Sequence, residues 1–232
     1  MRVPYGFLIL LVKADSACLF CDPGYRPLDL ITLPSPKADS FSSKEIATRL
    51  EISGAVAIFT QDIIIRGEKR LPLYKRVKEA SDCLTIVLPA LDEVSLDLAD
   101  ADLTWKEFLS KAGPGSFTPV SSNASAPTNI LFSSGTTGTP KAIPWTHLTP
   151  IKAAADGWAH HDIQTGDVVA WPTNLGWMMG PWLIYASLLN GASIALFEGS
   201  PLGDDFTTFV EKARVTMLGV VPSIVRSWRA NG

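Results

Sequence analysis

The stretch from Ile130 to Lys141 constrains the fold of this chain more than any other, because it joins an apolar strand to a loop of small residues. It reads Ile-Leu-Phe-Ser-Ser-Gly-Thr-Thr-Gly-Thr-Pro-Lys. The two glycines allow a tight turn and a close approach of the backbone to a ligand. The hydroxyl groups and the backbone N–H groups are hydrogen-bond donors, and Lys141 adds a positive charge. The pattern predicts a strand followed by a loop that suits a polyphosphate.

The order of residues in this loop argues against a plain turn and against two known nucleotide-binding loops. A cluster of Ser, Thr, Gly and Pro is usually only a surface turn, but here a strand-like Ile130–Phe132 precedes the cluster and a Pro-Lys pair follows it. A Walker loop has four residues between its glycines and ends in Lys-Ser/Thr. Only two residues separate Gly135 from Gly138, and Ala142 follows the lysine. The dinucleotide pattern G-x-G-x-x-G is absent too.

Residues 133–141 resemble the signature loop of the adenylate-forming superfamily, which includes acyl-CoA synthetases, luciferases and the adenylation domains of peptide synthetases. The signature is Ser/Thr-Ser/Gly-Gly-Thr/Ser-Thr-Gly-x-Pro-Lys, and every fixed position is matched. Residues 38–50, 171–177 and 197–201 are similar to plant acyl-activating enzymes of the acetyl-CoA-synthetase-like branch, above all to the peroxisomal group. The resemblance covers about residues 38–232.

The resemblance implies that the chain takes part in a reaction of ATP with a carboxylic acid. Thr136 and Thr137 would then hold the β and γ phosphates, and Lys141 would either offset their charge or anchor the loop; outside this motif, Lys141 would be an ordinary surface lysine. Magnesium is expected to accompany ATP, and coenzyme A is the implied cosubstrate. The expected phosphate-binding residues are Ser133, Ser134, Gly135, Thr136, Thr137, Gly138, Thr139, Pro140 and Lys141.

A second candidate site is the stretch Trp171–Met179 around Gly176. In the resembling acyl-CoA synthetases this Gly-Trp segment borders the acyl group, which by position implies an acyl pocket formed by Trp177, Met178 and Met179. Aromatic and sulfur-containing side chains can line a small apolar pocket. The same residues could equally pack in the core before a helix, and the sequence leaves both roles open.

The remaining polar groups are expected to have plainer roles. His160 and His161 are adjacent, so they do not face the same side of a helix and are not expected to bind one metal ion. Asp156 lies four residues before His160 and could pair with it, but a cap at the end of a helix is the expected role of this cluster. His147 is expected at most to support the loop from behind, and Asp204 with Asp205 to cap the helix that follows. We expect no metal site built by the protein.

Strands and helices alternate from residue 38 onward. This alternation is typical of a largely parallel sheet covered by helices on both faces. We therefore expect an α/β fold, namely part of the N-terminal domain of the adenylate-forming fold, over residues 38–232. Helices are expected near residues 42–50 (opened by a Ser42–Glu45 capping box), 72–80, 104–111, 150–159 (with Thr149 as N-cap), 181–189, 205–213 and 222–229, and strands at 55–59, 84–88, 130–132, 168–171, 193–197 and 215–220.

Residues 1–37 differ from the rest of the chain. Prolines at positions 4, 23, 27, 34 and 36 are expected to break any regular element there. Phe7–Val12 faintly resembles a signal peptide, but it is short and no clear cleavage site follows. We expect a divergent, poorly ordered segment.

Composition argues against several other classes of protein. A net charge of −3 without a basic patch gives no support to nucleic-acid binding. Three cysteines do not make a disulfide scaffold, and Cys18 with Cys21 is expected to be an ordinary reduced pair. The apolar run Met178–Leu189 is interrupted by Gly180-Pro181 and is shorter than the roughly 20 residues that cross a bilayer.

Several motifs of the family do not occur in these 232 residues. They are the adenine-binding Gly-Glu-Pro segment, the ribose-binding aspartate, the Arg-Thr-Gly-Asp hinge and the late catalytic lysine. We therefore expect a fragment of an AMP-forming acyl-CoA synthetase, or alternatively an inactive truncated module that binds a nucleotide or a partner. The resemblance implies a peroxisomal or cytoplasmic location, and no Ser-Lys-Leu-type address ends the sequence. The acid is not specified.

Overall fold

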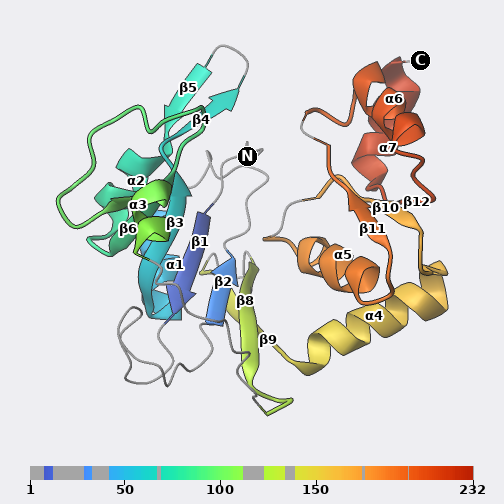
Figure 1. Ribbon diagram of the computed structural model, residues 1–232, viewed down its shortest axis with the longest axis horizontal. Coiled ribbons are helices and arrows are strands. Elements are labelled where there is room, and N and C mark those ends of the chain that lie inside the picture. The colour runs from blue at the N-terminus through green and yellow to red at the C-terminus, as the bar shows by residue number, and fades with distance from the viewer. Residues whose placement is uncertain are drawn as a thin grey trace. The chain divides into compact units, whose positions relative to one another are not determined.

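The computed structural model describes residues 8–12, 29–32, 42–66, 69–111, 123–133, 139–173, 176–197 and 199–231. The chain divides into two compact units, Met1–His147 and Leu148–Gly232 (Figure 1). Both units combine helices with β-sheets, and the expected α/β fold is confirmed.

A seven-stranded sheet organises the described part of unit 1, in the order β7-β6-β3-β1-β2-β8-β9. The pairs β6–β7, β3–β6 and β2–β8 are parallel, whereas β1 pairs antiparallel with β2 and β3, and β8 with β9. The strands are β1 Leu8–Val12, β2 Asp29–Thr32, β3 Ala55–Gln61, β6 Leu84–Leu88, β7 Leu103–Thr104, β8 Pro127–Ser133 and β9 Lys141–Thr146; a separate hairpin is formed by β4 Ile63–Arg66 and β5 Lys69–Pro72.

Strands β1 and β2 lie in the segment that was expected to lack regular elements, so that expectation is wrong for residues 8–12 and 29–32. The physical reason is the position of the prolines. All five lie at other positions of the sequence, so neither strand contains a residue that lacks an N–H group for the ladder. The other residues of the segment, at 1–7, 13–28 and 33–37, lie outside those that the structure describes.

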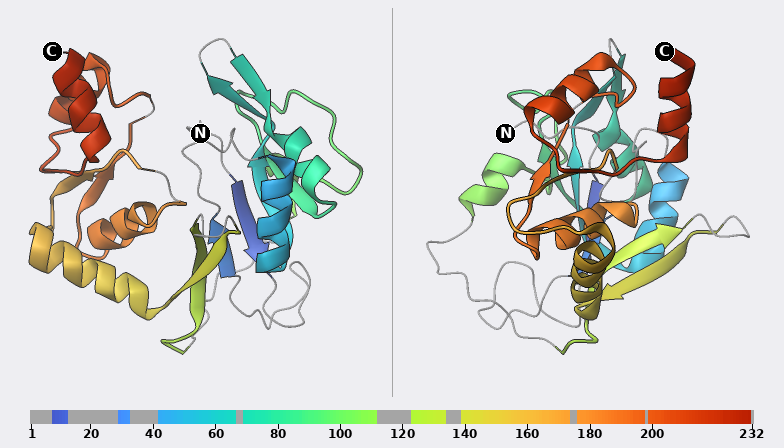
Figure 2. Two further views of the ribbon diagram at one scale, coloured as in Figure 1. Left: turned by 180° about the vertical axis from the view of Figure 1, so that it is seen from behind. Right: turned by 90° about the vertical axis from the view of Figure 1, so that its right-hand side faces the viewer.

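Helices cover both faces of this sheet. From one face, Ile58 of β3 packs with residues of α1 (Ser43–Ser53) and α2 (Leu73–Ala80). Its neighbour Ala57 points to the other face, where Phe108 of α3 (Trp105–Ser110) packs against the cluster of Ala57 and Ile86. Figure 1 shows α3 in front of the sheet, and the reversed view in Figure 2 shows α1 in front of it.

Capping boxes begin two of these helices. In α1, the Ser42 hydroxyl accepts a hydrogen bond from the Glu45 N–H at 3.3 Å, and the Glu45 carboxylate accepts one from the Ser42 N–H at 2.9 Å, as the sequence predicted. Thr104 and Glu107 form the same arrangement at the start of α3. Each box satisfies backbone N–H groups that a helix start leaves without partners.

Unit 2 contains a three-stranded parallel sheet in the order β11-β10-β12 among its described residues. Its strands are β10 Val168–Ala170, β11 Ser193–Ala195 and β12 Met217–Leu218, and its helices are α4 Leu148–His161, α5 Met179–Leu188, α6 Asp204–Lys212 and α7 Pro222–Asn231. Two expected caps are wrong. Thr149 lies inside α4 rather than before it. Gly203 is the N-cap of α6, so Asp204 and Asp205 lie in its first turn, where negative charges interact favourably with the helix dipole.

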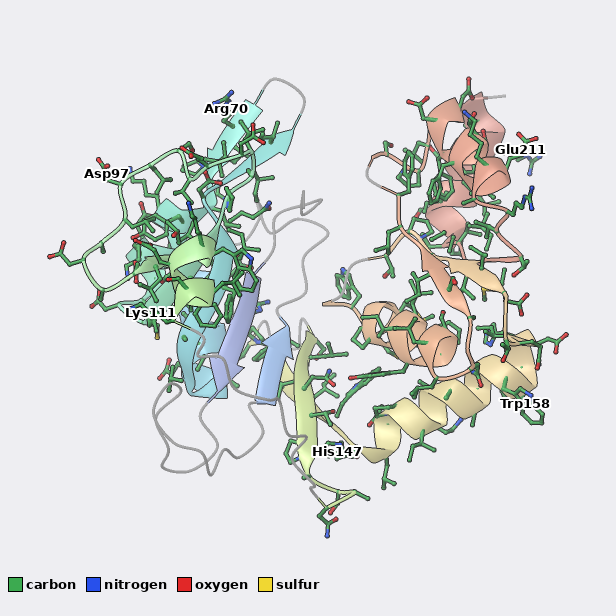
Figure 3. All side chains as sticks on the ribbon, viewed as in Figure 1. Arg70, Asp97, Lys111, His147, Trp158 and Glu211 are labelled. Atoms are coloured by element: carbon green, nitrogen blue, oxygen red, sulfur yellow. The ribbon has the colours of Figure 1, made fainter. Side chains whose placement is uncertain are left out.

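Helices α4 and α5 pack closely because a glycine lies at their contact. A Cβ atom on Gly157 would stand 2.9 Å from the Cβ of Ala186, closer than two side chains tolerate. The α4 residue Trp158 has 60% of its surface exposed and projects away from α5 (Figure 3). Packing of α4 on α5 therefore depends on the small residues of their contact.

Candidate functional site

The candidate phosphate loop connects β8 to β9, and the two strands hold its ends together. Ser133, the last residue of β8, pairs with Lys141, the first residue of β9, in the antiparallel ladder. Ser134, Gly135, Thr136, Thr137 and Gly138 lie outside the residues that the structure describes. The described hairpin therefore fixes both ends of the loop on adjacent strands.

Strand β8 is anchored in the core of unit 1. Leu131 and Phe132 are 5% and 4% exposed, and Phe132 belongs to the apolar cluster that contains Ile58. The Arg49 guanidinium lies 5.9 Å from the centre of the Phe132 ring, and its burial lowers the pKa of Arg49 although Glu45 acts in the opposite direction. A loop leaving such a strand starts from a rigid support.

Four of the nine expected phosphate-binding residues are described, and two of them are exposed. Thr139 and Lys141 are exposed, whereas Ser133 and Pro140 are half-buried. Lys141 forms no ion pair with any carboxylate in the described part of the chain. Its ammonium group is thus available to an anion from solution.

His147 follows the end of β9 that lies opposite to the loop. Six positions separate it from Lys141, which is about 20 Å along an extended strand. Its N–H donates to the Ala126 carbonyl at 3.2 Å, and its Nε2 is buried with no partner among the described residues (Figure 3). It closes the base of the hairpin.

The segment expected to border an acyl group leads into α5. Trp177 and Met178 are 49% and 60% exposed, and Met179, the first residue of α5, is half-buried. This exposure argues against core packing for Trp177 and Met178. Aromatic and thioether groups at a surface are typical of binding sites.

The topology of unit 2 adds an independent reason to place a ligand near this segment. The chain moves from β10 to β11 on one side and then returns to β12 on the other. In open α/β sheets, ligands bind at the carboxyl ends of the strands where the strand order reverses. Trp171 directly follows β10 at that edge, and the chain runs from there to Trp177. The sequence placed Trp171 at the start of the candidate stretch but assigned the acyl pocket to Trp177, Met178 and Met179.

A cluster of charged residues on α4 has a structural role. Asp156 forms an ion pair with Lys152, and its Oδ1 lies 3.9 Å from Nε2 of His160, a contact that the spacing allowed. The hydrogen bond from Lys152 lowers the pKa of Asp156.

The described residues contain no group of three or more His, Cys, Asp or Glu side chains placed to hold a metal ion. None of the described helices has the length and apolar character needed to span a membrane.

Comparison with known proteins agrees with the signature loop and the fold. A family model described as AMP-binding enzyme matches residues 30–232, so this chain belongs to the family of AMP-binding enzymes. The match begins at residue 30 rather than 38 and therefore takes in most of β2.

Plant acyl-activating enzymes are among the most similar relatives, as the resemblance predicted. Hexanoyl-CoA synthase of Cannabis sativa is 63% identical over 197 residues, which cover 83% of this chain and 27% of the relative. Probable acyl-activating enzyme 17, peroxisomal, of Arabidopsis thaliana is 59% identical over 196 residues, which again cover 83% of this chain and 27% of the relative. This chain thus spans about 27% of the length of these curated relatives.

Solved structures give the same fold. Acetoacetyl-CoA synthetase from Streptomyces lividans superposes with a TM-score of 0.71 at 27% identity, over 83% of this chain and 30% of the other. An acyl-CoA synthetase of Brucella canis reaches a TM-score of 0.70 at 21% identity, over 87% and 34%, and supports the fold alone.

Proposed function

We propose that this chain supplies the phosphate-binding loop and part of the acid-binding site of an AMP-forming acyl-CoA synthetase. The observation that carries the proposal is the complete signature at residues 133–141, with its two ends paired on β8 and β9. The similarity to enzymes named as acyl-CoA synthetases supports the reaction class.

The proposed reaction has two steps. A carboxylate oxygen attacks the α-phosphorus of ATP, the bond from that phosphorus to the β-phosphate oxygen breaks, and pyrophosphate leaves. The sulfur of coenzyme A then attacks the acyl carbonyl, and AMP leaves. Transfers of this kind depend on holding the phosphates and offsetting their charge while the attacking oxygen is in line.

The loop is proposed to hold the phosphates in the first step. Hydroxyl and N–H groups of Thr136 and Thr137 would donate to the β and γ phosphates, and Lys141 would offset their negative charge. Magnesium is proposed to arrive on the phosphates of ATP. The exposure of Lys141 and its lack of an ion pair within the described residues support this role.

The acid is proposed to bind in unit 2, beside Trp177, Met178 and Met179. The exposure of Trp177 and Met178 and the reversal of strand order at β10 support this placement. A relative is named hexanoyl-CoA synthase, so hexanoate is the acid of choice for tests.

A peroxisomal location is proposed because the names of two relatives contain the word peroxisomal. Imaging of the tagged protein tests this location.

The phosphate role is tested by charge removal at Lys141. Magnesium-ATP affinity is measured by calorimetry for the 232-residue chain, for Lys141→Ala and for Lys106→Ala, a control that removes another exposed lysine, on α3. Hydrogen bonds to charged groups contribute ~1.5–3 kcal/mol, so Lys141→Ala should weaken binding at least about tenfold. Equal affinities for the two variants would reject the proposed contact.

A further inference from the structure

At the carboxyl ends of β10 and β12, the ring of Trp171 packs directly against Gly219. Gly219 follows β12, and its N–H donates to the Ala170 carbonyl at the end of β10 at 2.8 Å. A Cβ atom placed on Gly219 would overlap Cε3 and Cδ2 of Trp171. The indole of Trp171 therefore occupies the space that any other residue at position 219 would need for its side chain.

Packing alone holds the Trp171 ring within the described residues. Its centre lies 5.7 Å from that of Trp182 on α5, at an interplanar angle of 72°. Trp182 in turn meets the His161 ring edge-on at 4.9 Å. The Trp171 Nε1 atom is buried and has no hydrogen-bond partner among the described residues. Since no described hydrogen bond restrains the ring, its position depends on the space left at Gly219.

The ring also lies where the topology predicts a ligand. Trp171 and Gly219 are the first residues after β10 and β12, which are the two strands between which the strand order reverses. Trp171 is only half-buried, and six positions later the chain reaches the exposed Trp177. An apolar ring fixed by packing at such an edge forms a wall for an apolar ligand.

We propose that Trp171 is a specificity-determining residue of the acid site, and that Gly219 sets how far its ring reaches into that site. The inference rests on the proposed function, because it assigns a carboxylic acid to unit 2. A ring pushed away from residue 219 shortens the space for the acyl chain, and a smaller side chain at position 171 lengthens it.

The test enlarges the side chain at position 219 and shrinks the side chain at position 171 in the 232-residue chain. Affinities for acetate, hexanoate and octanoate are measured from backbone amide shifts for the wild type, Gly219→Ala, Trp171→Leu and the double variant. Gly219→Ala should lower the hexanoate-to-acetate affinity ratio about tenfold or more, in the range expected for a changed apolar pocket. Trp171→Leu should raise the octanoate-to-hexanoate ratio, and the double variant should return toward wild type because leucine leaves room for the new methyl group.

Gly203→Ala is the matched control, since a Cβ atom there would meet nothing within 4 Å, and it should leave both ratios unchanged. If Gly219→Ala does not fold, the affinity ratios of Trp171→Leu and of the double variant still test the inference. Unchanged ratios in Trp171→Leu, or no acid-dependent shifts in unit 2, would overturn the inference. Magnesium-ATP is titrated in parallel: shifts in residues 133–141 would then show that the phosphate part of the proposed function survives, and their absence would show that it fails too.

Discussion

Asp62 shows how a single residue organises unit 1. Its side chain is 1% exposed. Its Oδ1 accepts hydrogen bonds from the N–H groups of Ile63 and Ala90, both at 2.8 Å, and its Oδ2 accepts from the N–H and hydroxyl of Ser95, both at 2.9 Å. One carboxylate thus ties the loop after β6 to the end of β3.

Asp62→Asn should therefore destabilise the chain, although it changes only one atom. The amide nitrogen donates rather than accepts, so in either orientation of the amide at least one backbone N–H group loses its acceptor. Such a loss costs roughly 1–3 kcal/mol when the group is buried. Urea unfolding followed by circular dichroism measures the loss. Asp92→Asn, an exposed change in the same loop, is the control. Equal midpoints for the two variants would show that the Asp62 network contributes nothing.

Glu107 makes a pH-dependent contribution to the start of α3. Hydrogen bonds from the Thr104 N–H and hydroxyl lower the pKa of Glu107 below its ordinary value of 4.5. The cap is therefore complete above that value and is lost as pH falls through the lower pKa of the folded state. The Thr104 amide shift should titrate with a midpoint below 4.5 in the wild type and lose that transition in Glu107→Gln. A midpoint at or above the ordinary value would contradict the capping geometry.

At the scale of elements, the contact of α4 with α5 depends on Gly157. Alanine favours a helix by about 1 kcal/mol over glycine, but overpacking against Ala186, 2.9 Å from the added Cβ, typically costs ~1–3 kcal/mol. Gly157→Ala should thus fail to stabilise the chain and should lower its thermal midpoint. A raised midpoint would mean that the two helices separate without cost.

Local sequence signals predicted a helix or strand well where the residues that determine the element lie within one short segment. The capping box at Ser42 placed α1 correctly because both partners lie within one turn. The β4–β5 hairpin was missed, although its two-residue connection begins with Gly67, a known hairpin signal. Strand β9 was missed because Pro144 argues against a strand, yet proline is tolerated on the edge strand that β9 is.

The two parts of the candidate site differ in how far sequence could predict them. The phosphate loop is continuous in sequence, so its signature could be read directly. Trp171 and Gly219 are 48 positions apart, and their contact exists only because β10 and β12 are neighbours. A tryptophan in an apolar stretch is indistinguishable by pattern from a core residue. The sequence placed Trp171 in the candidate stretch, but the strand order was needed to find its contact with Gly219.

At the scale of the whole molecule, we predict that the 232-residue chain does not catalyse acid-dependent exchange of pyrophosphate into ATP. Its sequence lacks the family motifs that hold adenine and ribose and the late lysine, and catalytic groups that act as a unit lose most of the rate when several are missing. The assay uses labelled pyrophosphate with acetate, hexanoate and aromatic acids. Robust exchange with any acid would show that these residues suffice for adenylation.

The central claim is that residues 133–141 hold the β and γ phosphates of ATP. Its most direct measurement is a map of backbone amide shifts in the isotope-labelled chain with the magnesium complexes of ATP, pyrophosphate and AMP. ATP and pyrophosphate should shift the amides of Ser133, Thr136, Thr137 and Lys141 more than those of β3 and β6, and AMP should shift them far less. Equal responses to AMP and ATP, or shifts confined to other regions, would contradict the account.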